Sequence, residues 1–317
     1  MAFTGSVGIW GMKDNDFQAT NFAGSAAGLQ AAIDYLGGAK GKVFIGPGTL
    51  LLTVPVTLAS NLTLIGSGMG VTILKHSSIT LHTMLSATSK SLWTVSDLSI
   101  DGDQTGVSSY SADRWTRQET IDLATCTDFT IKNVEITACR GQGIYGTSCT
   151  RGTISGCWIH DTDNWGSVLK VATDIDYLDN HIENVFTHGL YCDSQTSAGG
   201  STRIRFIGNT VVNCQNDATH TDSGVGISCQ KASGTSGVYD VTVIGNYAKN
   251  NGAMGFSMTP GSRTSGYLGK MTIQGNHSEG HTANAGIGYE LIASHVTCSG
   301  NTAKNNKYHL TAQASKG

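Results

Sequence analysis

The chain has 317 residues, among them 41 Gly and only 3 Pro, and its formal net charge is −3. This near-neutral balance argues against a surface built as a whole for nucleic acid or an anionic membrane. There is no run of 18 apolar residues and no basic segment followed by an apolar one at the start, so we expect neither membrane insertion nor a signal peptide.

The first predicted element is a helix that starts after Ser25 and ends at the glycine pair after Leu36. Serine is a favoured N-cap and glycine a favoured C-cap. Leu29, Ile33 and Leu36 give the helix one apolar stripe. We expect residues 1–38 to be an N-terminal segment in which this helix covers one end of the fold.

The rest of the chain, residues 39–317, is expected to form the coils of a single domain that spans 1–317. Short strands rich in β-branched residues recur there, and each ends at a polar corner. From the first corner at residue 133 to the last at residue 301 there are six steps in 168 residues, a mean of 28 residues per step. Three short strands per unit with Gly or Asn at the corners are typical of an all-β parallel β-helix. The corner residues are Asn133, Cys157, Asn180, Asn209, Asn246, Asn276 and Asn301.

The corner asparagines should stack into a ladder of amide hydrogen bonds, which Cys157 interrupts. Alternation along "GLYCD" points Leu190 and Cys192 into the lumen and the residues between them outward. Cys229 takes the inward position on the next turn, so two of the eight cysteines stack. We interpret the cysteines as buried thiols, because their spacing matches no zinc site.

The N-terminal stretch "AAGLQAAIDYLGGAKGKVFIGPGTLLLTVPVTLASNLTLIGSGMGVTIL" resembles the start of pectate-lyase-like β-helix proteins. These include polysaccharide lyases, glycoside hydrolases and phage tailspikes. The resemblance implies a single-stranded right-handed parallel β-helix of about 9–11 turns. The Asn-Thr-Asp, Asp-Asp and Gly-His-Gly motifs of polygalacturonases are absent, as is the "YGFDPH" motif of alginate epimerases. No activity is therefore carried over by motif.

In this superfamily the substrate lies along one outward sheet and its loops. The matching sheet here is expected to run from "GIYGT" at 143 to "GYELI" at 288. The strand "GSVLKV", which contains Lys170, is expected to be shifted in register by one residue relative to the other strands. Its outward residues are Asp122, Tyr145, Lys170, Tyr191, Asp193, Gln230 and Glu290. The loops entering the sheet add His160, Asp161, Asp163, Trp165, His188, Asp217, His220 and Asp222, and a polar insertion at 101–120 adds Asp113, Arg114, Trp115 and Arg117.

Two reactions remain open. Glycoside hydrolysis needs two carboxylates, for which Asp193 with Asp163 or Asp222 is the best pair. Uronate β-elimination needs a base and a cation that neutralises the carboxylate. The candidate bases are Lys170, His188, His220 and Tyr191, and the candidate neutralisers are Arg114 and Arg117.

The remaining predicted site residues would bind substrate, and Trp115 could stack on a sugar ring. These residues are Tyr145, Asp122, Gln230 and Glu290. No cofactor and no metal are expected. The alternative is Ca²⁺ held by the aspartates at 161, 163, 217 and 222.

These observations favour a polysaccharide-processing protein, a tailspike-like or secreted depolymerase of an acidic glycan. The alternatives are a non-catalytic module of a phage or viral spike that binds a glycan or receptor, and a purely structural spike segment. The expected partner is a polysaccharide or cell-surface glycan, with no nucleic acid. The protein is expected to be a monomer or homotrimer, extracellular or associated with a virion.

Overall fold

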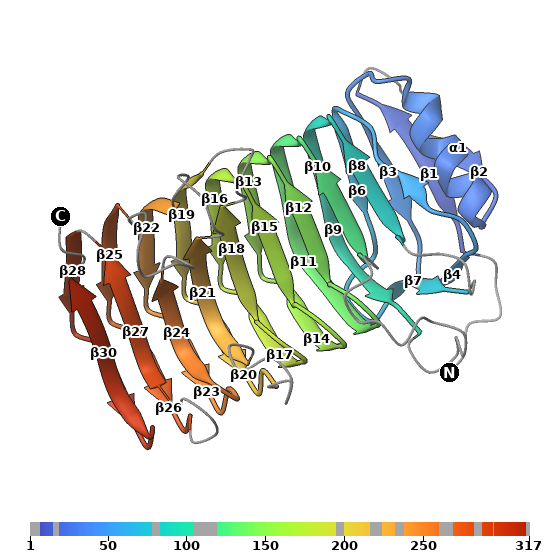
Figure 1. The fold of residues 1–317 in the computed structure, drawn as a ribbon. Helices are drawn as coiled ribbons and strands as arrows, with labels where there is room; N and C mark the ends of the chain where they lie inside the picture. Colours follow the sequence, from blue (N-terminus) through green and yellow to red (C-terminus); the bar gives the residue numbers. More distant parts are fainter. Residues whose placement is uncertain are drawn as a thin grey trace.

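The computed structural model describes residues 7–14, 19–77, 83–103, 119–194, 200–215, 224–231, 238–259, 269–281, 287–293 and 295–314. The chain winds into a solenoid whose turns stack side by side from the N-terminal to the C-terminal end (Figure 1). Neighbouring turns pair through parallel strands, as from β13 (Thr150–Ser155) to β16 (Thr173–Leu178) to β19 (Ser201–Ile207). This confirms the predicted parallel β-helix.

The turns present three faces. Two of them belong to one large sheet and meet at a corner, and the third face is a separate sheet with ten strands among the described residues. Ten strands agree with the expected number of turns. The first face contains β3 (Gly41–Ile45), β6 (Leu62–Ile65), β13 (Thr150–Ser155), β16 (Thr173–Leu178), β19 (Ser201–Ile207), β22 (Val238–Ile244), β25 (Lys270–Gln274) and β28 (His295–Ser299). The second face contains β4 (Gly48–Leu52), β7 (Thr72–His76), β14 (Trp158–Thr162), β17 (His181–Val185), β20 (Thr210–Val212), β23 (Tyr247–Lys249), β26 (His277–Glu279) and β29 (Thr302–Lys304). The third face contains β5 (Val56–Thr57), β8 (Leu85–Thr88), β10 (Ile121–Ala124), β12 (Ile144–Thr147), β15 (Ser167–Lys170), β18 (Leu190–Ser194), β21 (Val225–Lys231), β24 (Met254–Thr259), β27 (Ile287–Ala293) and β30 (Tyr308–Ala314).

Two longer strands run through the corner between the first and second faces: β9 (Ser91–Asp101) and β11 (Thr127–Cys139). At this corner each strand has a residue with a left-handed backbone, Asp97 (φ 57°) in β9 and Asn133 (φ 50°) in β11. Asp, Asn and Gly tolerate this conformation best. The same corner position is glycine in several other turns, for example Gly208 (φ 68°).

The expected N-terminal helix is α1 (Ala26–Leu36). The Ser25 hydroxyl accepts a hydrogen bond from the Gly28 backbone at 3.1 Å, and Gly37 ends the helix in a left-handed conformation. The predicted stripe of leucine and isoleucine is buried. The helix packs beside β1 (Ile9–Lys13) and β2 (Thr20–Phe22), which pair antiparallel, at one end of the solenoid (Figure 1).

The asparagine ladder forms from Asn180 to Asn301. The Asn209 side chain donates to Asn246 Oδ1 at 2.9 Å and accepts from the Asn180 amide at 2.9 Å. Asn133 is an error in the predicted ladder: it occupies the left-handed corner and its side chain donates to Asp97 Oδ1. Cys157 was expected to interrupt the ladder, but because Asn133 is not a member, Cys157 lies one turn before the first ladder asparagine, Asn180, and its backbone N–H donates to Asn180 Oδ1.

The lumen is filled by stacked apolar side chains. Tyr177 stacks on Phe206 with ring centroids 5.1 Å apart, and Phe256 stacks on Tyr289 at 4.9 Å. All eight cysteines are free thiols and only Cys298 is exposed. Cys192 pairs in register with Cys229, as the buried-thiol interpretation predicts. Among the described residues, no helix is long and apolar enough to span a membrane.

Candidate functional site

The third face carries two outward rows in register along the solenoid axis. Every outward residue predicted for this sheet lies in one of them. The first row is Ser86, Asp122, Tyr145, Val168, Tyr191, Ser228, Ser257 and Glu290. The second row includes Thr147, Lys170, Asp193 and Gln230.

The suspected register shift at Lys170 does not occur. Lys170 pairs directly with Asp193 of the next turn. The irregular sequence of β15 has another cause, because Ser167 takes an inward position that is isoleucine or leucine in the neighbouring turns. Its hydroxyl lies 3.2 Å from the Tyr177 hydroxyl, so a hydrogen bond satisfies both buried groups.

We call six residues on three neighbouring turns and their flanks the third-face cluster: Tyr145, Trp165, Lys170, His188, Tyr191 and Asp193. Trp165 stacks on Tyr191 with centroids 5.7 Å apart. The Lys170 ammonium lies 5.6 Å from the Tyr145 ring and 5.5 Å from the Trp165 ring. Both contacts are within the range of cation–π attraction. The cluster therefore combines a cation, aromatic surface and a carboxylate.

Although Tyr191 and Asp193 point outward, both are largely buried. Tyr191 is 9% exposed and Asp193 is 7% exposed. The edge of the His188 ring contacts Tyr191 with centroids 5.1 Å apart. Within the described part of the chain, His188 Nδ1 is buried without a hydrogen-bond partner. A buried polar atom left without a partner is costly and requires an explanation.

Burial shifts the pKa values of His188 and Tyr191 in opposite directions. It lowers the pKa of His188 to about 4, so the imidazole is a free base at neutral pH. Burial, with the Asp193 carboxylate as a further cause, raises the pKa of Tyr191 well above its usual value, so the phenol stays protonated. Two titratable groups whose pKa values are driven apart are typical of an acid–base pair.

The other predicted residues lie elsewhere. Asp122 and Glu290 share a row with Tyr191 but are three strands away on either side. At about 4.8 Å per strand this is roughly 14 Å. Glu290 instead accepts a hydrogen bond from Ser257 at 3.1 Å. Gln230 is adjacent to Asp193. Seven predicted residues lie outside the described residues: Asp113, Arg114, Trp115, Arg117, Asp217, His220 and Asp222.

His160 and Asp161 were expected in a loop entering the third face, but "WIHDT" forms β14 of the second face. Ile159 points into the lumen, so Trp158 and His160 point outward. Asp163 lines a hollow of about 380 Å³ with Asp161, and Asp193, the partner proposed for Asp163, is not among the residues that line it. The other residues that line this hollow are Thr162, Asn184, Phe186 and Gln215.

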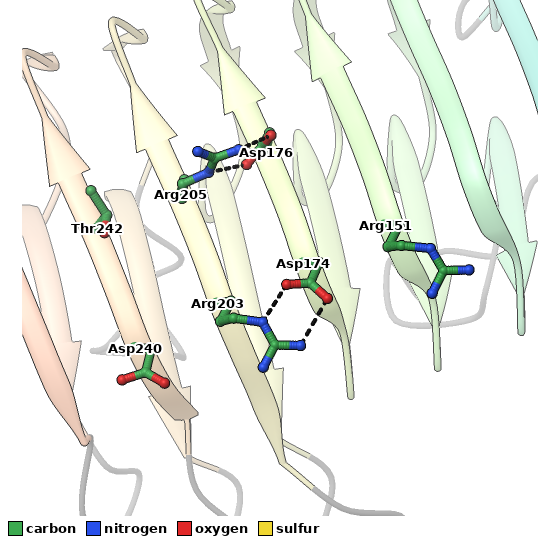
Figure 2. A pocket seen from close by; sticks show the side chains of 7 residues that line it. All are labelled: Arg151, Asp174, Asp176, Arg203, Arg205, Asp240 and Thr242. Atoms are coloured by element: carbon green, nitrogen blue, oxygen red, sulfur yellow. Dashed lines mark hydrogen bonds and ion pairs between the residues drawn. The ribbon is translucent and has the colours of Figure 1, made fainter.

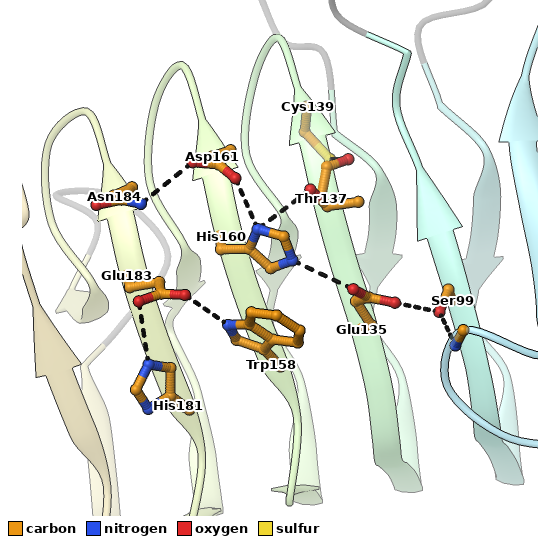
Figure 3. A network of polar contacts seen from close by, with 11 residues as sticks. Ser99, Glu135, Thr137, Cys139, Trp158, His160, Asp161, His181, Glu183 and Asn184 are labelled. Carbon is orange, nitrogen blue, oxygen red and sulfur yellow. Dashed lines mark hydrogen bonds and ion pairs between the residues drawn. The ribbon is translucent and has the colours of Figure 1, made fainter.

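The sequence analysis missed a polar network on the second face (Figure 3). Trp158 stacks on His160 and its indole N–H donates to Glu183 at 3.1 Å. His160 lies between two carboxylates, with Nδ1 2.7 Å from Asp161 and Nε2 3.4 Å from Glu135. These residues come from successive turns, which is why no local motif revealed them.

The first face carries a row of alternating charges that was also missed (Figure 2). Arg151 contacts both carboxylate oxygens of Asp128, at 2.6 and 2.8 Å, and Arg203 binds Asp174 in the same way. Arg205 forms a third bidentate pair, with Asp176. The arginines hold the pKa of Asp128 and that of Asp174 below their usual range. Alternating charge at one repeat position was the signal for this row.

Among the described residues, no group of three His, Cys, Asp or Glu side chains is arranged to hold a metal ion. Of the four aspartates considered for Ca²⁺, Asp161 and Asp163 share the second-face hollow. The other two lie outside the described residues.

A family model described as "Right handed beta helix region" matches residues 84–303. No curated protein matches the chain. The mannuronan C-5 epimerase AlgE4 A-module of Azotobacter vinelandii has a similar structure, with 17% identity, a TM-score of 0.54, and 92% of this chain and 96% of that chain covered.

Two further solved structures share the fold. The N-terminal fragment of bacteriophage phi29 gene product 12 is 13% identical with a TM-score of 0.59, and the match covers 90% of this chain and 61% of that fragment. An exopolygalacturonase of Thermotoga maritima is 12% identical with a TM-score of 0.51, with 91% and 86% covered. At these identities the likeness concerns the fold alone.

Proposed function

The chain belongs to the right-handed β-helix family, and from that premise we propose that it is a polysaccharide-processing enzyme that removes the C5 proton of a uronate residue. The observation that carries this proposal is the acid–base pair of His188 and Tyr191 on the same face as Lys170 and Asp193. An epimerase that acts at C5 of mannuronan is among the proteins that share the fold.

In the proposed reaction Lys170 binds the uronate carboxylate and neutralises it, which acidifies the C5 proton. The free-base imidazole of His188 takes that proton. The C5–H electron pair forms the C4=C5 double bond as the C4–O4 bond breaks, and Tyr191 donates its proton to the departing O4. Asp193, in register with Lys170, positions the ammonium group. Charge and atoms balance without a cofactor.

Hydrolysis is less well supported by the described residues. It requires two carboxylates within about 10 Å of each other. The described outward acids nearest to Asp193 along the third face, Asp122 and Glu290, are each three strands away. Elimination needs only the base, the acid and the cation that the cluster already contains.

The test is incubation with a panel of acidic and neutral polysaccharides. The double bond conjugated with the uronate carboxylate absorbs in the ultraviolet, and new reducing ends report any cleavage. Absorbance that rises with reducing ends supports elimination, and Lys170→Met should abolish it. Reducing ends without absorbance would replace elimination by hydrolysis. If neither absorbance nor reducing ends rise with any polysaccharide, but binding is retained, the protein is a glycan-binding module and the proposal of an enzyme is wrong.

A further inference from the structure

Trp158 on the second face is an aromatic surface that is both open to solvent and fixed in place. Its side chain is 38% exposed. The ring stacks on His160 with centroids 4.1 Å apart and an interplanar angle of 25°. The indole N–H is held by Glu183. A large ring fixed at two points can stack on a ligand with little loss of conformational entropy.

The support behind Trp158 extends over three turns. Glu135 lies one turn before Trp158 and pairs with it in register, and His181 lies one turn after it. His160 lies within reach of a carboxylate at each ring nitrogen, Asp161 at Nδ1 and Glu135 at Nε2. His181 Nε2 is also 3.4 Å from Glu183. The orientation of Trp158 is therefore set by its neighbours (Figure 3).

Hydrogen-bonding groups lie beside this surface. The hollow of about 380 Å³ is formed by residues at the ends of the same strands, β14 and β17, and by their neighbours. Its lining includes two carboxylates, Asp161 and Asp163, and two side-chain amides, Asn184 and Gln215. Carboxylates accept hydrogen bonds from hydroxyl groups, and amides both donate and accept them. An exposed aromatic ring next to such groups suits a sugar.

The negative charge of the second-face network favours a neutral sugar over an acidic one. The network contains Glu135, Asp161 and Glu183, and no Lys or Arg takes part in it among the residues drawn (Figure 3). Such a surface repels a uronate or a sulfated sugar. It differs in this respect from the third face, where Lys170 supplies a cation.

We propose that the second face carries a binding site for a neutral glycan, in which one sugar ring stacks on Trp158 and hydroxyl groups bind Glu183 and the adjacent hollow. This site is separate from the third-face cluster and does not depend on it. The protein would then hold a polysaccharide through neutral residues on one face and act on acidic residues on another.

The test is affinity gel electrophoresis of the whole chain in gels containing amylopectin, galactomannan, xyloglucan or mixed-linkage β-glucan, with alginate and polygalacturonate for comparison. At least one neutral polysaccharide should retard the wild-type protein. Trp158→Ala should weaken that binding about tenfold or more. Glu183→Ala, which removes the tether and an acceptor without removing the ring, should weaken it in the same direction.

The matched control is Tyr239→Ala, because Tyr239 is also an exposed aromatic residue, at 41%, but lies in β22 of the first face. It should retain full binding, as should Asp193→Asn on the third face. The proposal is overturned if no neutral polysaccharide retards the wild type, if both second-face variants bind as well as the wild type, or if Tyr239→Ala loses as much. If Lys170→Met loses elimination activity but still binds the neutral polysaccharide, the two sites are independent.

Discussion

The first and third faces use the same kinds of charged residue in opposite surroundings. On the first face, Arg205 is bound by both oxygens of Asp176 on the preceding turn, and its side chain is 56% exposed. On the third face, Asp193 is 7% exposed, and the neighbouring His188 has a buried nitrogen without a partner among the described residues.

This difference indicates a structural role for the charged residues of the first face and a chemical role for those of the third. Each exposed ion pair between turns already has its partner and contributes little to the free energy of folding. Buried titratable groups shift their pKa values and remain costly to the fold, which is typical of a functional site. Three predictions test this contrast.

The largest expected effect is on activity. Tyr191→Phe keeps the ring that stacks on Trp165 but removes the proposed proton donor. We expect the rate of elimination to fall about a thousandfold, near 4 kcal/mol in transition-state free energy. Initial rates of ultraviolet absorbance on the active polysaccharide measure it.

Tyr239→Phe, at an exposed tyrosine in β22 of the first face, is the control and should keep the wild-type rate. A rate within threefold of wild type for Tyr191→Phe would remove the phenol from the mechanism.

The next effect is on stability at acid pH. The pKa of His188 is lowered by burial from 6.5 to about 4 in the folded protein. Between these values the unfolded chain binds a proton that the folded chain does not, so stability falls as pH drops from about 6.5 to 4. Each such histidine accounts for a loss of about 3 kcal/mol at most.

His281, buried in the lumen with a pKa of about 4, should contribute a similar loss. His188→Gln should therefore remove about half of the dependence of the unfolding free energy on pH, as measured by denaturant titrations between pH 4 and 7. Equal slopes for His188→Gln and wild type would show that the His188 ring is hydrated.

The smallest effect is expected on the first face. A double-mutant cycle of Arg205→Ala and Asp176→Ala should give a coupling free energy below about 1 kcal/mol, reduced further by salt. Activity should not change. A larger coupling that resists salt, or a loss of activity, would contradict the structural interpretation of the charge row.

Local residue patterns were sufficient for the helix cap and for the inward rows. Ser25 and Gly37 cap α1 because their side-chain and backbone preferences act within one turn. The alternation in "GLYCD" placed Cys192 inside because successive side chains in a strand point to opposite faces. The corner alignment failed at Asn133, because Asn133 takes the left-handed position that is Gly156 in the next turn and Val134 takes the ladder position.

The sequence by itself determined the parallel β-helix, most of its asparagine ladder and the set of residues that face outward on the third sheet, since all of these follow from a short period repeated many times. Only the tertiary structure decided which outward side chains become buried and which acquire partners. Glu135, His160 and Glu183 are separated by about one repeat each, and they meet only when the turns stack. Burial of Tyr191 and His188 likewise depends on the folded surroundings, and it is burial that sets their pKa values.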